Sequence, residues 1–191
     1  MKSEHIKTRF VLTATKKQAQ PPVIGTHRAS AVMLPIIDMN DHAHILLCKR
    51  PTYLHHHPGE ICLPGGKFEP QDINLRTTAL RELDEELNIK ASNITVLGHL
   101  PKYSTLTGFT ISPFVGLLNT HTRWRNDYNE VQASFLVSLT DLSNEANWQS
   151  FNFQYFGKTI TFQGFKTPHG LLWGATASII KNFTKQLALP V

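Results

Sequence analysis

The sequence predicts an α/β fold of the α+β kind, in which a β-sheet packs between helices. Five short apolar segments have the length of strands, and two longer segments are expected to be helices. Strands and helices are interleaved along the chain, which favours helices packed on the faces of a sheet. Hydrophobic residues make up 41% of the 191 residues, enough to bury a core.

The first 28 residues are expected to be an N-terminal extension or a lead-in strand, followed by one domain over residues 29–191. No clear apolar pattern runs through residues 1–28, and the Gln/Pro-rich stretch at 18–22 is typical of a linker. The segment lacks the uninterrupted apolar core of a secretory signal. Its mild excess of basic residues is compatible with a mitochondrial transit segment.

Apolar runs and turn residues divide the domain into its expected elements. Residues 29–37 and 43–48 are predicted to form two strands of a hairpin, joined by the turn-like residues 38–41. A long loop over 50–64 follows, and a loop of this length in a compact domain is often functional. The remaining expected elements are a helix at 75–87, strands at 94–97, 110–118 and 133–137, and a helix at 172–188.

Composition and charge exclude several protein classes. The longest nearly apolar run, residues 29–37, is far shorter than the ~20 residues of a membrane-spanning helix. Two cysteines, Cys48 and Cys62, provide neither a disulfide framework nor a zinc-binding spacing, so we expect both to be reduced and half-buried. A net charge of +5 favours anionic partners, but the chain lacks the long basic block of many nucleic-acid-binding proteins.

The helix expected at 75–87 carries three glutamates on one side. On a helical wheel, Glu85 and Glu86 lie within about 60° of Glu82. Asp84 lies about 200° around the helix from Glu82, so we exclude it from a shared site. The leucines of the helix form an adjoining apolar face.

The ends of this helix are marked in the sequence. Asp72 and Asn74 are both residues that can cap a helix N-terminus. Asn88 follows the last apolar position and can adopt the left-handed conformation that ends a helix.

Three glutamates within about one helical turn repel one another, and a divalent cation would remove that repulsion. Magnesium prefers oxygen ligands and commonly bridges protein carboxylates to substrate phosphates. Gly65 and Gly66, before the helix, would let the backbone approach a phosphate closely. The helix also carries acidic and basic residues four positions apart, so an ordinary solvated helix with surface ion pairs is the alternative.

The whole string from Gly66 to Ile89 resembles the Nudix box, G-x5-E-x7-R-E-U-x-E-E-x-G-U, in which U is a bulky apolar residue. The second half matches from Arg81 onward, except that Asn88 replaces a glycine. In the first half, Asp72 stands where the box has glutamate, and eight residues rather than seven separate it from Arg81. The resemblance to the Nudix family implies an α/β/α sandwich with a mixed β-sheet between helices.

The departures from the box resemble one branch of this family, the coenzyme A diphosphatases. Boxes of that branch tend to combine PGG-K-x-D-P-x-D with T-A-L-R-E, similar to residues 64–72 and 78–82 here. The branch also has an upstream signature, roughly L-L-T-x-R-S-x-x-L-R-x-H-x-G-Q-x-x-F-P-G-G. The positions that match it are Arg50, Leu54, His57, Gly59 and the Pro-Gly-Gly at 64–66. The positions that depart from it are Cys48, Pro51, His55, Glu60 and Leu63. Residues 172–177 are similar to the W-G-x-T-A segment that opens the last helix of this branch.

The resemblance implies a role for each charged residue of the box. Glu82 and Glu86 would be the main metal ligands, and Glu85 would be a further ligand or hold a metal-bound water. Arg81 would orient the carboxylates through charge-assisted hydrogen bonds. In some Nudix enzymes a glutamate on a later loop is the general base, and Glu130 occupies a suitable place.

Substrate phosphates are expected to meet basic side chains and the glycine turn. The candidate substrate-binding residues are Lys49, Arg50, Lys67, Gly65 and Gly66. Each lysine or arginine has the alternative of being a solvated end of a strand or loop.

The predicted function is hydrolysis of the diphosphate linkage of coenzyme A or its thioesters, with Mg²⁺ or Mn²⁺ as cofactor. The products would be a 4′-phosphopantetheine species and adenosine 3′,5′-bisphosphate. Alternatives are a Nudix hydrolase of ADP-ribose, a nucleoside diphosphate sugar, a nucleoside triphosphate or capped RNA, a non-catalytic binding module, and a basic nucleic-acid-binding domain. The expected partner is a small-molecule nucleotide, and no membrane association is expected. The expected location is the cytoplasm, and a homodimer is compatible with the sequence.

Overall fold

The computed structural model describes residues 2–13, 27–54, 56–105, 107–155 and 158–188. Its helices are α1 (Ser3–Leu12), α2 (Leu75–Leu87), α3 (Leu139–Ser143) and α4 (Gly174–Ala188), with 3₁₀ turns η1 (Ala91–Asn93) and η2 (Glu145–Asn147). Its first strands are β1 (Arg28–Met39), β2 (His42–Lys49), β3 (Ile61–Cys62), β4 (Gly65–Lys67), β5 (Ile94–His99) and β6 (Tyr103–Ser104). The later strands are β7 (Phe109–Leu118), β8 (Ala133–Ser138), β9 (Trp148–Tyr155), β10 (Lys158–Thr167) and β11 (Gly170–Leu172).

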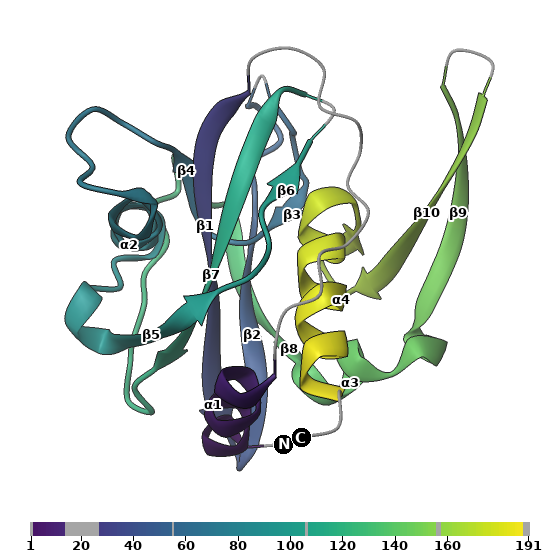
Figure 1. Cartoon of the computed structure of the whole chain (residues 1–191). Helices are drawn as coiled ribbons and strands as arrows, with labels where there is room; N and C mark the ends of the chain where they lie inside the picture. Colours follow the sequence, from purple (N-terminus) through teal and green to yellow (C-terminus); the bar gives the residue numbers. More distant parts are fainter. Residues whose placement is uncertain (1, 14–26, 55, 106, 156–157, 189–191) are drawn as a thin grey trace.

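A mixed sheet forms the middle layer of the molecule. Its main path runs β3-β2-β1-β7-β5, with β4 also paired to β1, β6 to β7 and β8 to β2. Strands β1 and β7 are parallel, whereas β1 and β2 form an antiparallel hairpin. Helix α2 covers one face of this sheet, and α1 and α4 lie on the other (Figure 1). The predicted arrangement of a mixed sheet between helices is therefore confirmed.

The central strand β1 is apolar along most of its length because both of its faces are buried. Met33 packs in the core beneath α2, whereas Leu34 and Ile36 pack in the core shared with α1 and α4. All three side chains are fully buried. The two cores hold β1 at the centre of the sheet, where it supports β4 and the site described below.

Residues 3–12 are helical, so of the two alternatives expected for the N-terminal segment, an extension or a lead-in strand, the strand is wrong there. Ile6 and Phe10, four residues apart, lie on one side of α1 and are buried against the core. The backbone N–H of Ser3 donates to a carboxylate oxygen of Asp38 at 3.0 Å, which joins the start of α1 to β1. Two apolar positions in an otherwise polar segment are too weak a pattern to predict this helix. The linker expected at 18–22 lies outside the described residues.

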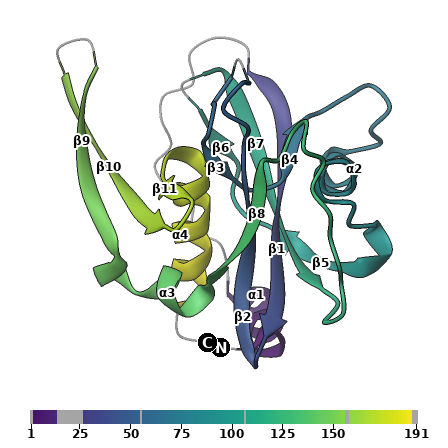
Figure 2. The ribbon, with the colours of Figure 1, turned by 180° about the vertical axis from the view of Figure 1, so that it is seen from behind.

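A second, three-stranded sheet follows β8, in the order β11-β10-β9, and the sequence analysis missed it. Strands β9 and β10 form a long hairpin that extends away from the central sheet (Figure 2). The final helix, expected at 172–188, begins at Gly174. Among the described residues, no helix is long and apolar enough to span a membrane.

Candidate functional site

The glycine turn lies directly between the central strand and the acidic helix. Gly65 and Gly66 are in β4, paired in register with Val32 and Ala31 of β1. A methyl group added at Gly66 would overlap the carboxylate of Glu82, and one at Gly65 would overlap the backbone of β1. Glycine is therefore required at position 65 by the approach of the sheet, whereas at position 66 it leaves room for the Glu82 carboxylate.

Helix α2 has a defined beginning and end. Asn74 caps the N-terminus, because its side-chain oxygen accepts from the backbone N–H groups of Arg76 and Thr77, each at 3.0 Å. Asn88 ends the helix in the left-handed conformation, with φ of 54°, as expected for the residue that replaces glycine in the box. Asp72, the other proposed cap, has a different role and is an anchor for Arg81.

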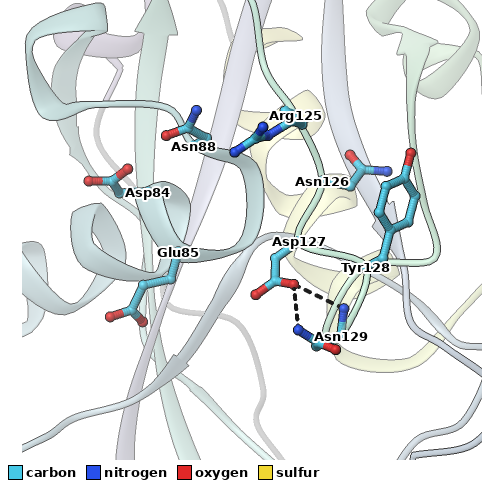
Figure 3. Close-up of a pocket in the computed structure, with 8 residues that line it drawn as sticks. All are labelled: Asp84, Glu85, Asn88, Arg125, Asn126, Asp127, Tyr128 and Asn129. Carbon is cyan, nitrogen blue, oxygen red and sulfur yellow. Dashed lines mark hydrogen bonds between the residues drawn. The ribbon is translucent and has the colours of Figure 1, made fainter.

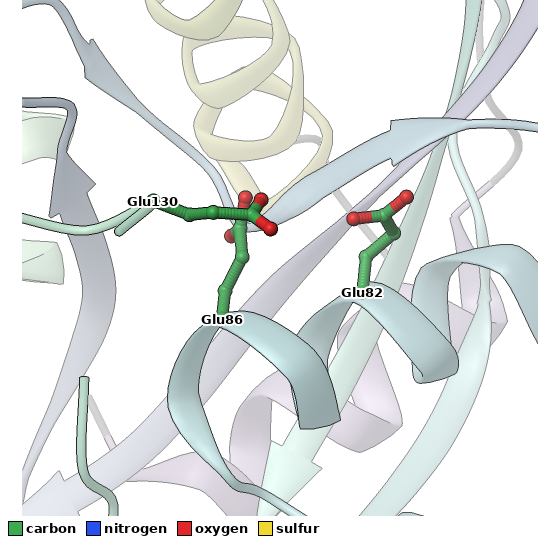
Figure 4. A group of neighbouring side chains, drawn as sticks. All are labelled: Glu82, Glu86 and Glu130. Carbon is green, nitrogen blue, oxygen red and sulfur yellow. The ribbon is translucent and has the colours of Figure 1, made fainter. Parts of the chain in front are cut away.

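Three carboxylates come together at the middle of the site. Glu82 and Glu86 rise from consecutive turns of α2, and Glu130 reaches toward them from the facing loop (Figure 4). One oxygen from each side chain lies within 4.8 Å of the others. Glu82 and Glu86 are buried, with 8% and 2% of their surface exposed, whereas Glu130 is exposed. The cluster therefore opens to solvent on the Glu130 side.

Backbone hydrogen bonds hold the turn that carries Glu130. The N–H of Asp127 donates to the carbonyl of Glu86 at 2.9 Å, which ties the turn to the end of α2. The N–H groups of Glu130 and Val131 both donate to the carbonyl of Asp127. This turn brings a residue far along the chain to the carboxylates of the box.

Burial and mutual repulsion make the cluster unfavourable when all three groups are charged. Burial foremost, together with the neighbouring carboxylates of Glu82 and Glu130, raises the pKa of Glu86 to about 8. The charge of Arg50 and the backbone N–H of Gly65 act in the opposite direction. Burial also raises the pKa of Glu82. A divalent cation among these oxygens would compensate both effects, so the donor set fits a hard, oxygen-binding metal such as Mg²⁺ or Mn²⁺.

Arg81 connects the box to the loop before it. Its guanidinium donates to both carboxylate oxygens of Asp72, at 3.0 and 3.1 Å, and to the carbonyl of Lys67. It also lies 3.0 Å from Glu82 and 2.7 Å from Glu85. Hydrogen bonds from Arg81 foremost, together with those from the Glu69 backbone and Thr78, lower the pKa of Asp72 to about 2. Asp72 stands where the family has glutamate, and the sequence analysis missed this pairing because the two residues are not helical neighbours.

Glu85 is turned away from the three clustered carboxylates. Its carboxylate accepts from Arg81 at 2.7 Å, and half of its side chain is exposed. It lines a pocket of about 520 Å³ with Asp84, Asn88 and residues 125–129 (Figure 3). Asp127 in this pocket accepts from the backbone and side-chain nitrogens of Asn129, each at 3.0 Å. The role of Glu85 as a metal ligand or catalytic residue stays a prediction.

The basic residues expected to bind substrate have different environments. Lys49 ends β2, and Arg50 follows it at the start of the loop. The Nε atom of Arg50 is buried and has no hydrogen-bond partner among the described residues. Lys67 is exposed at the end of β4 and uses its backbone carbonyl to accept from Arg81. Arg50 is thus a half-buried cation with an unpaired, buried Nε, whose charge acts on Glu86 and which is suited to an anionic ligand.

Two other residues of the upstream signature pair with each other. His57 and Glu60 lie 2.9 Å apart through Nδ1 and a carboxylate oxygen. Glu60, which departs from the coenzyme A signature, therefore has a partner in the same loop. His55, another departure, lies outside the described residues.

Both cysteines are free thiols on adjacent strands. Cys48 of β2 and Cys62 of β3 are register partners, with Cys48 fully buried and Cys62 half-buried. Burial raises the pKa of Cys62 above its usual range. Cys48 therefore lies deeper than the half-buried position expected from the sequence.

Replacing Gly66 with alanine should weaken metal binding by at least about 10-fold, the scale of a displaced supporting group at a metal site. The added methyl group would occupy the space of the Glu82 carboxylate and push it from the cluster. Isothermal titration with Mn²⁺ would measure the affinity. Gly108→Ala is the control for backbone strain without a clash, because φ is +81° there but the added methyl group meets nothing within 4 Å. Equal affinity in wild type and Gly66→Ala would contradict this packing.

The metal-free protein should lose stability as the pH rises from about 5 to about 8. In this range Glu86 keeps its proton in the folded state, whose pKa is about 8, and releases it on unfolding, where the pKa is near 4.5. The folded state therefore binds the extra proton, and stability falls by up to about 1.4 kcal/mol per pH unit. Urea unfolding at several pH values would measure the slope, which Glu86→Gln should flatten. A slope unchanged by the substitution would show that another group titrates.

Comparisons with known proteins agree with this geometry. A family model described as the NUDIX domain matches residues 26–156. The chain is 32% identical over 165 residues to a protein of Yersinia pestis (strain Pestoides F) named "Uncharacterized Nudix hydrolase NudL", covering 86% of this chain and 82% of the relative.

Two solved structures share the fold. One is a Nudix hydrolase from M. smegmatis, RenU, with a TM-score of 0.52 and 17% identity over 68% of this chain and 80% of that one. The other is a MutT/nudix family protein from Enterococcus faecalis, with a TM-score of 0.56 and 14% identity over 95% of this chain and 72% of that one. The family model matches most of this chain, and the Yersinia relative is aligned over most of its length. Together with the carboxylates on α2, these matches show that this chain belongs to the Nudix hydrolase family.

Proposed function

We propose that this protein hydrolyses the diphosphate linkage of coenzyme A or its thioesters with Mg²⁺ or Mn²⁺. The observation that carries the hydrolytic part is the cluster of Glu82, Glu86 and Glu130, whose oxygens lie within 4.8 Å of one another. Repulsion and burial make such a cluster unfavourable when it is fully charged, and a bound cation would remove that cost. The coenzyme A part is supported by the resemblance of the loop at 50–64 and of the box to that branch.

Glu82 and Glu86 would hold the metal, with Glu85 as the further ligand implied by the family. When bound, a divalent cation supplies Lewis-acid chemistry, lowering the pKa of water and neutralising charge on the diphosphate. Arg81 keeps this carboxylate face in place through its bonds to Asp72 and its contact with Glu82. Its contribution is to position ligands rather than to react.

Glu130 is the proposed general base. It is the exposed member of the cluster, and its turn is fastened to the end of α2. In the reaction, Glu130 takes a proton from water as the water oxygen bonds to one phosphorus. The bridging P–O bond breaks, and the released phosphate keeps the electron pair. With coenzyme A, the products are 4′-phosphopantetheine and adenosine 3′,5′-bisphosphate.

Arg50 is the strongest candidate to bind the diphosphate. Its buried Nε has no partner among the described residues, so an anionic oxygen would satisfy it. Lys49 and Lys67 are proposed as additional cationic groups at the edge of the site, and the backbone of Gly65 and Gly66 as the surface against which the phosphates lie.

Incubation of the purified protein with coenzyme A and Mg²⁺ or Mn²⁺ should yield adenosine 3′,5′-bisphosphate, identified by mass spectrometry. The same panel should contain acetyl-coenzyme A, ADP-ribose, a nucleoside diphosphate sugar, a nucleoside triphosphate and capped RNA. Cleavage of another compound but not of coenzyme A would support the hydrolase activity and reject coenzyme A as its substrate. Binding without cleavage across the panel with both metals would favour a non-catalytic Nudix module.

A further inference from the structure

Two exposed tyrosines border a small pocket beside the turn that carries Glu130. Tyr53 and Tyr128 expose 67% and 72% of their surface, although large aromatic side chains gain from burial. Both line a pocket of about 170 Å³ together with Pro51, Thr52 and Gln132. The walls thus combine aromatic rings, a proline ring and one side-chain amide.

The walls of this pocket are connected by hydrogen bonds. The hydroxyl of Tyr53 donates to the backbone carbonyls of Tyr128 and Asn129, at 3.0 and 3.1 Å. The N–H of Gln132 donates to the carbonyl of Lys49 at 2.8 Å. The loop after β2 and the Glu130 turn are therefore joined on both sides of the pocket. The Tyr53 ring, already held by its hydroxyl, would lose little conformational entropy when a ligand binds.

The residues that line the pocket belong to the same two segments that carry Arg50 and Glu130. Arg50 directly precedes Pro51, and Tyr128 lies in the same turn as Glu130. A nucleotide whose diphosphate meets Arg50 and the carboxylate cluster would extend its aromatic end along either segment. A planar base can stack on aromatic rings, and the amide of Gln132 offers a donor and an acceptor to its edge.

The larger pocket next to Glu85 is less suitable for a nucleotide. It is lined by the carboxylates of Asp84, Glu85 and Asp127, with Arg125 as its cationic side chain. The carboxylates of Asp84 and Asp127, which lie outside the proposed metal ligands, would repel a substrate that carries several phosphates. The smaller pocket has no charged side chain among the residues that line it.

We propose that the pocket between Tyr53 and Tyr128 binds the purine base of the nucleotide half of the substrate. This inference rests on the proposed function, because it names the subsite for one end of the same substrate. Stacking tolerates small differences between bases, whereas the amide of Gln132 and the size of the pocket would select for a purine. Tyr53 and Tyr128 would thus determine affinity for the nucleotide and leave the bond cleavage to the carboxylates.

The test compares Tyr128→Leu, which removes the ring, with Tyr128→Phe, which keeps it. Adenosine 3′,5′-bisphosphate is the probe with a base, and inorganic pyrophosphate is the probe without one. Isothermal titration with Mg²⁺ would measure both affinities, and saturation-transfer NMR would report contact with the adenine protons. Tyr128→Leu should bind the nucleotide at least about 10-fold more weakly, the scale of one base–aromatic stack. Tyr128→Phe should stay near wild type, and pyrophosphate should bind all three equally.

Three outcomes would overturn the subsite. They are unchanged nucleotide affinity in Tyr128→Leu, equal weakening of both probes, and no saturation transfer to adenine in wild type. The binding measurements require no turnover, so they are separate from the test of the hydrolase. Absence of cleavage in wild type would reject the proposed function, while selective loss of the nucleotide probe would still support a base-binding pocket.

Discussion

Glu86→Gln should reduce metal-dependent diphosphate hydrolysis by at least about 10²–10³-fold, the range seen when one preorganised electrostatic group is lost from an active site. Glu86 is the most buried carboxylate of the cluster, and the charges of both Glu82 and Glu130 act on it. Glutamine keeps the shape of the side chain but removes the charge that would attract the cation. Steady-state rates with Mg²⁺ and Mn²⁺ would measure the loss.

The fold should survive this substitution. Because the pKa of Glu86 is about 8, the side chain is largely protonated near neutral pH without a metal, and glutamine resembles that neutral form. The unfolding free energy of the metal-free variant should therefore equal or exceed that of wild type at pH 8. Asp84→Asn is the matched control, because Asp84 lies on the same helix but pairs with Lys90 at 2.8 Å. Activity retained in Glu86→Gln, or lost equally in Asp84→Asn, would contradict the assigned site.

Arg81→Met should destabilise the protein by about 3 kcal/mol or more, the usual cost of removing one partner from a buried ion pair. Asp72, with 4% of its side chain exposed, would keep a buried charge without its main partner. Its remaining donors, the N–H of Glu69 and the hydroxyl of Thr78, would not neutralise that charge. Urea unfolding of the metal-free protein at pH 7 would measure the change.

The control for this substitution is Arg76→Met on the same helix. Arg76 is exposed, so its replacement should change stability by less than about 0.5 kcal/mol. Arg81→Lys should recover little, because a lysine cannot bind both oxygens of Asp72 and also reach Glu85. A loss of stability as small as that of Arg76→Met would show that the Arg81 network contributes little to the fold.

Much of the acidic helix could be predicted from local sequence. Its bounds at 75 and 87 agree with the structure, because capping by Asn74 and termination by Asn88 depend on residues within one turn of the helix. The shared side of Glu82 and Glu86 also follows from the spacing of four residues. The hairpin of β1 and β2 was predicted for the same reason, since two apolar runs flank a short turn.

Helix α1 and the β9–β10 hairpin could not be predicted in this way. Helix α1 forms although only Ile6 and Phe10 face the core, so the packing against α4 and the sheet stabilises it more than its own sequence does. In β9 and β10, the register pairs Phe151 with Phe162, and their rings stack with centroids 5.6 Å apart. Such cross-strand pairs become visible only when the strands meet.

The sequence by itself determined the family, the acidic helix and the residues able to bind a cation, because these depend on residue types at fixed local spacing. The tertiary structure decided which of them share a site. It brought Glu130 to Glu82 and Glu86, turned Glu85 toward Arg81, and made Asp72 the anchor of that arginine rather than a helix cap. These choices depend on how the loops after β2, β4 and β7 pack against α2, and contacts between distant segments leave no periodic pattern in the sequence.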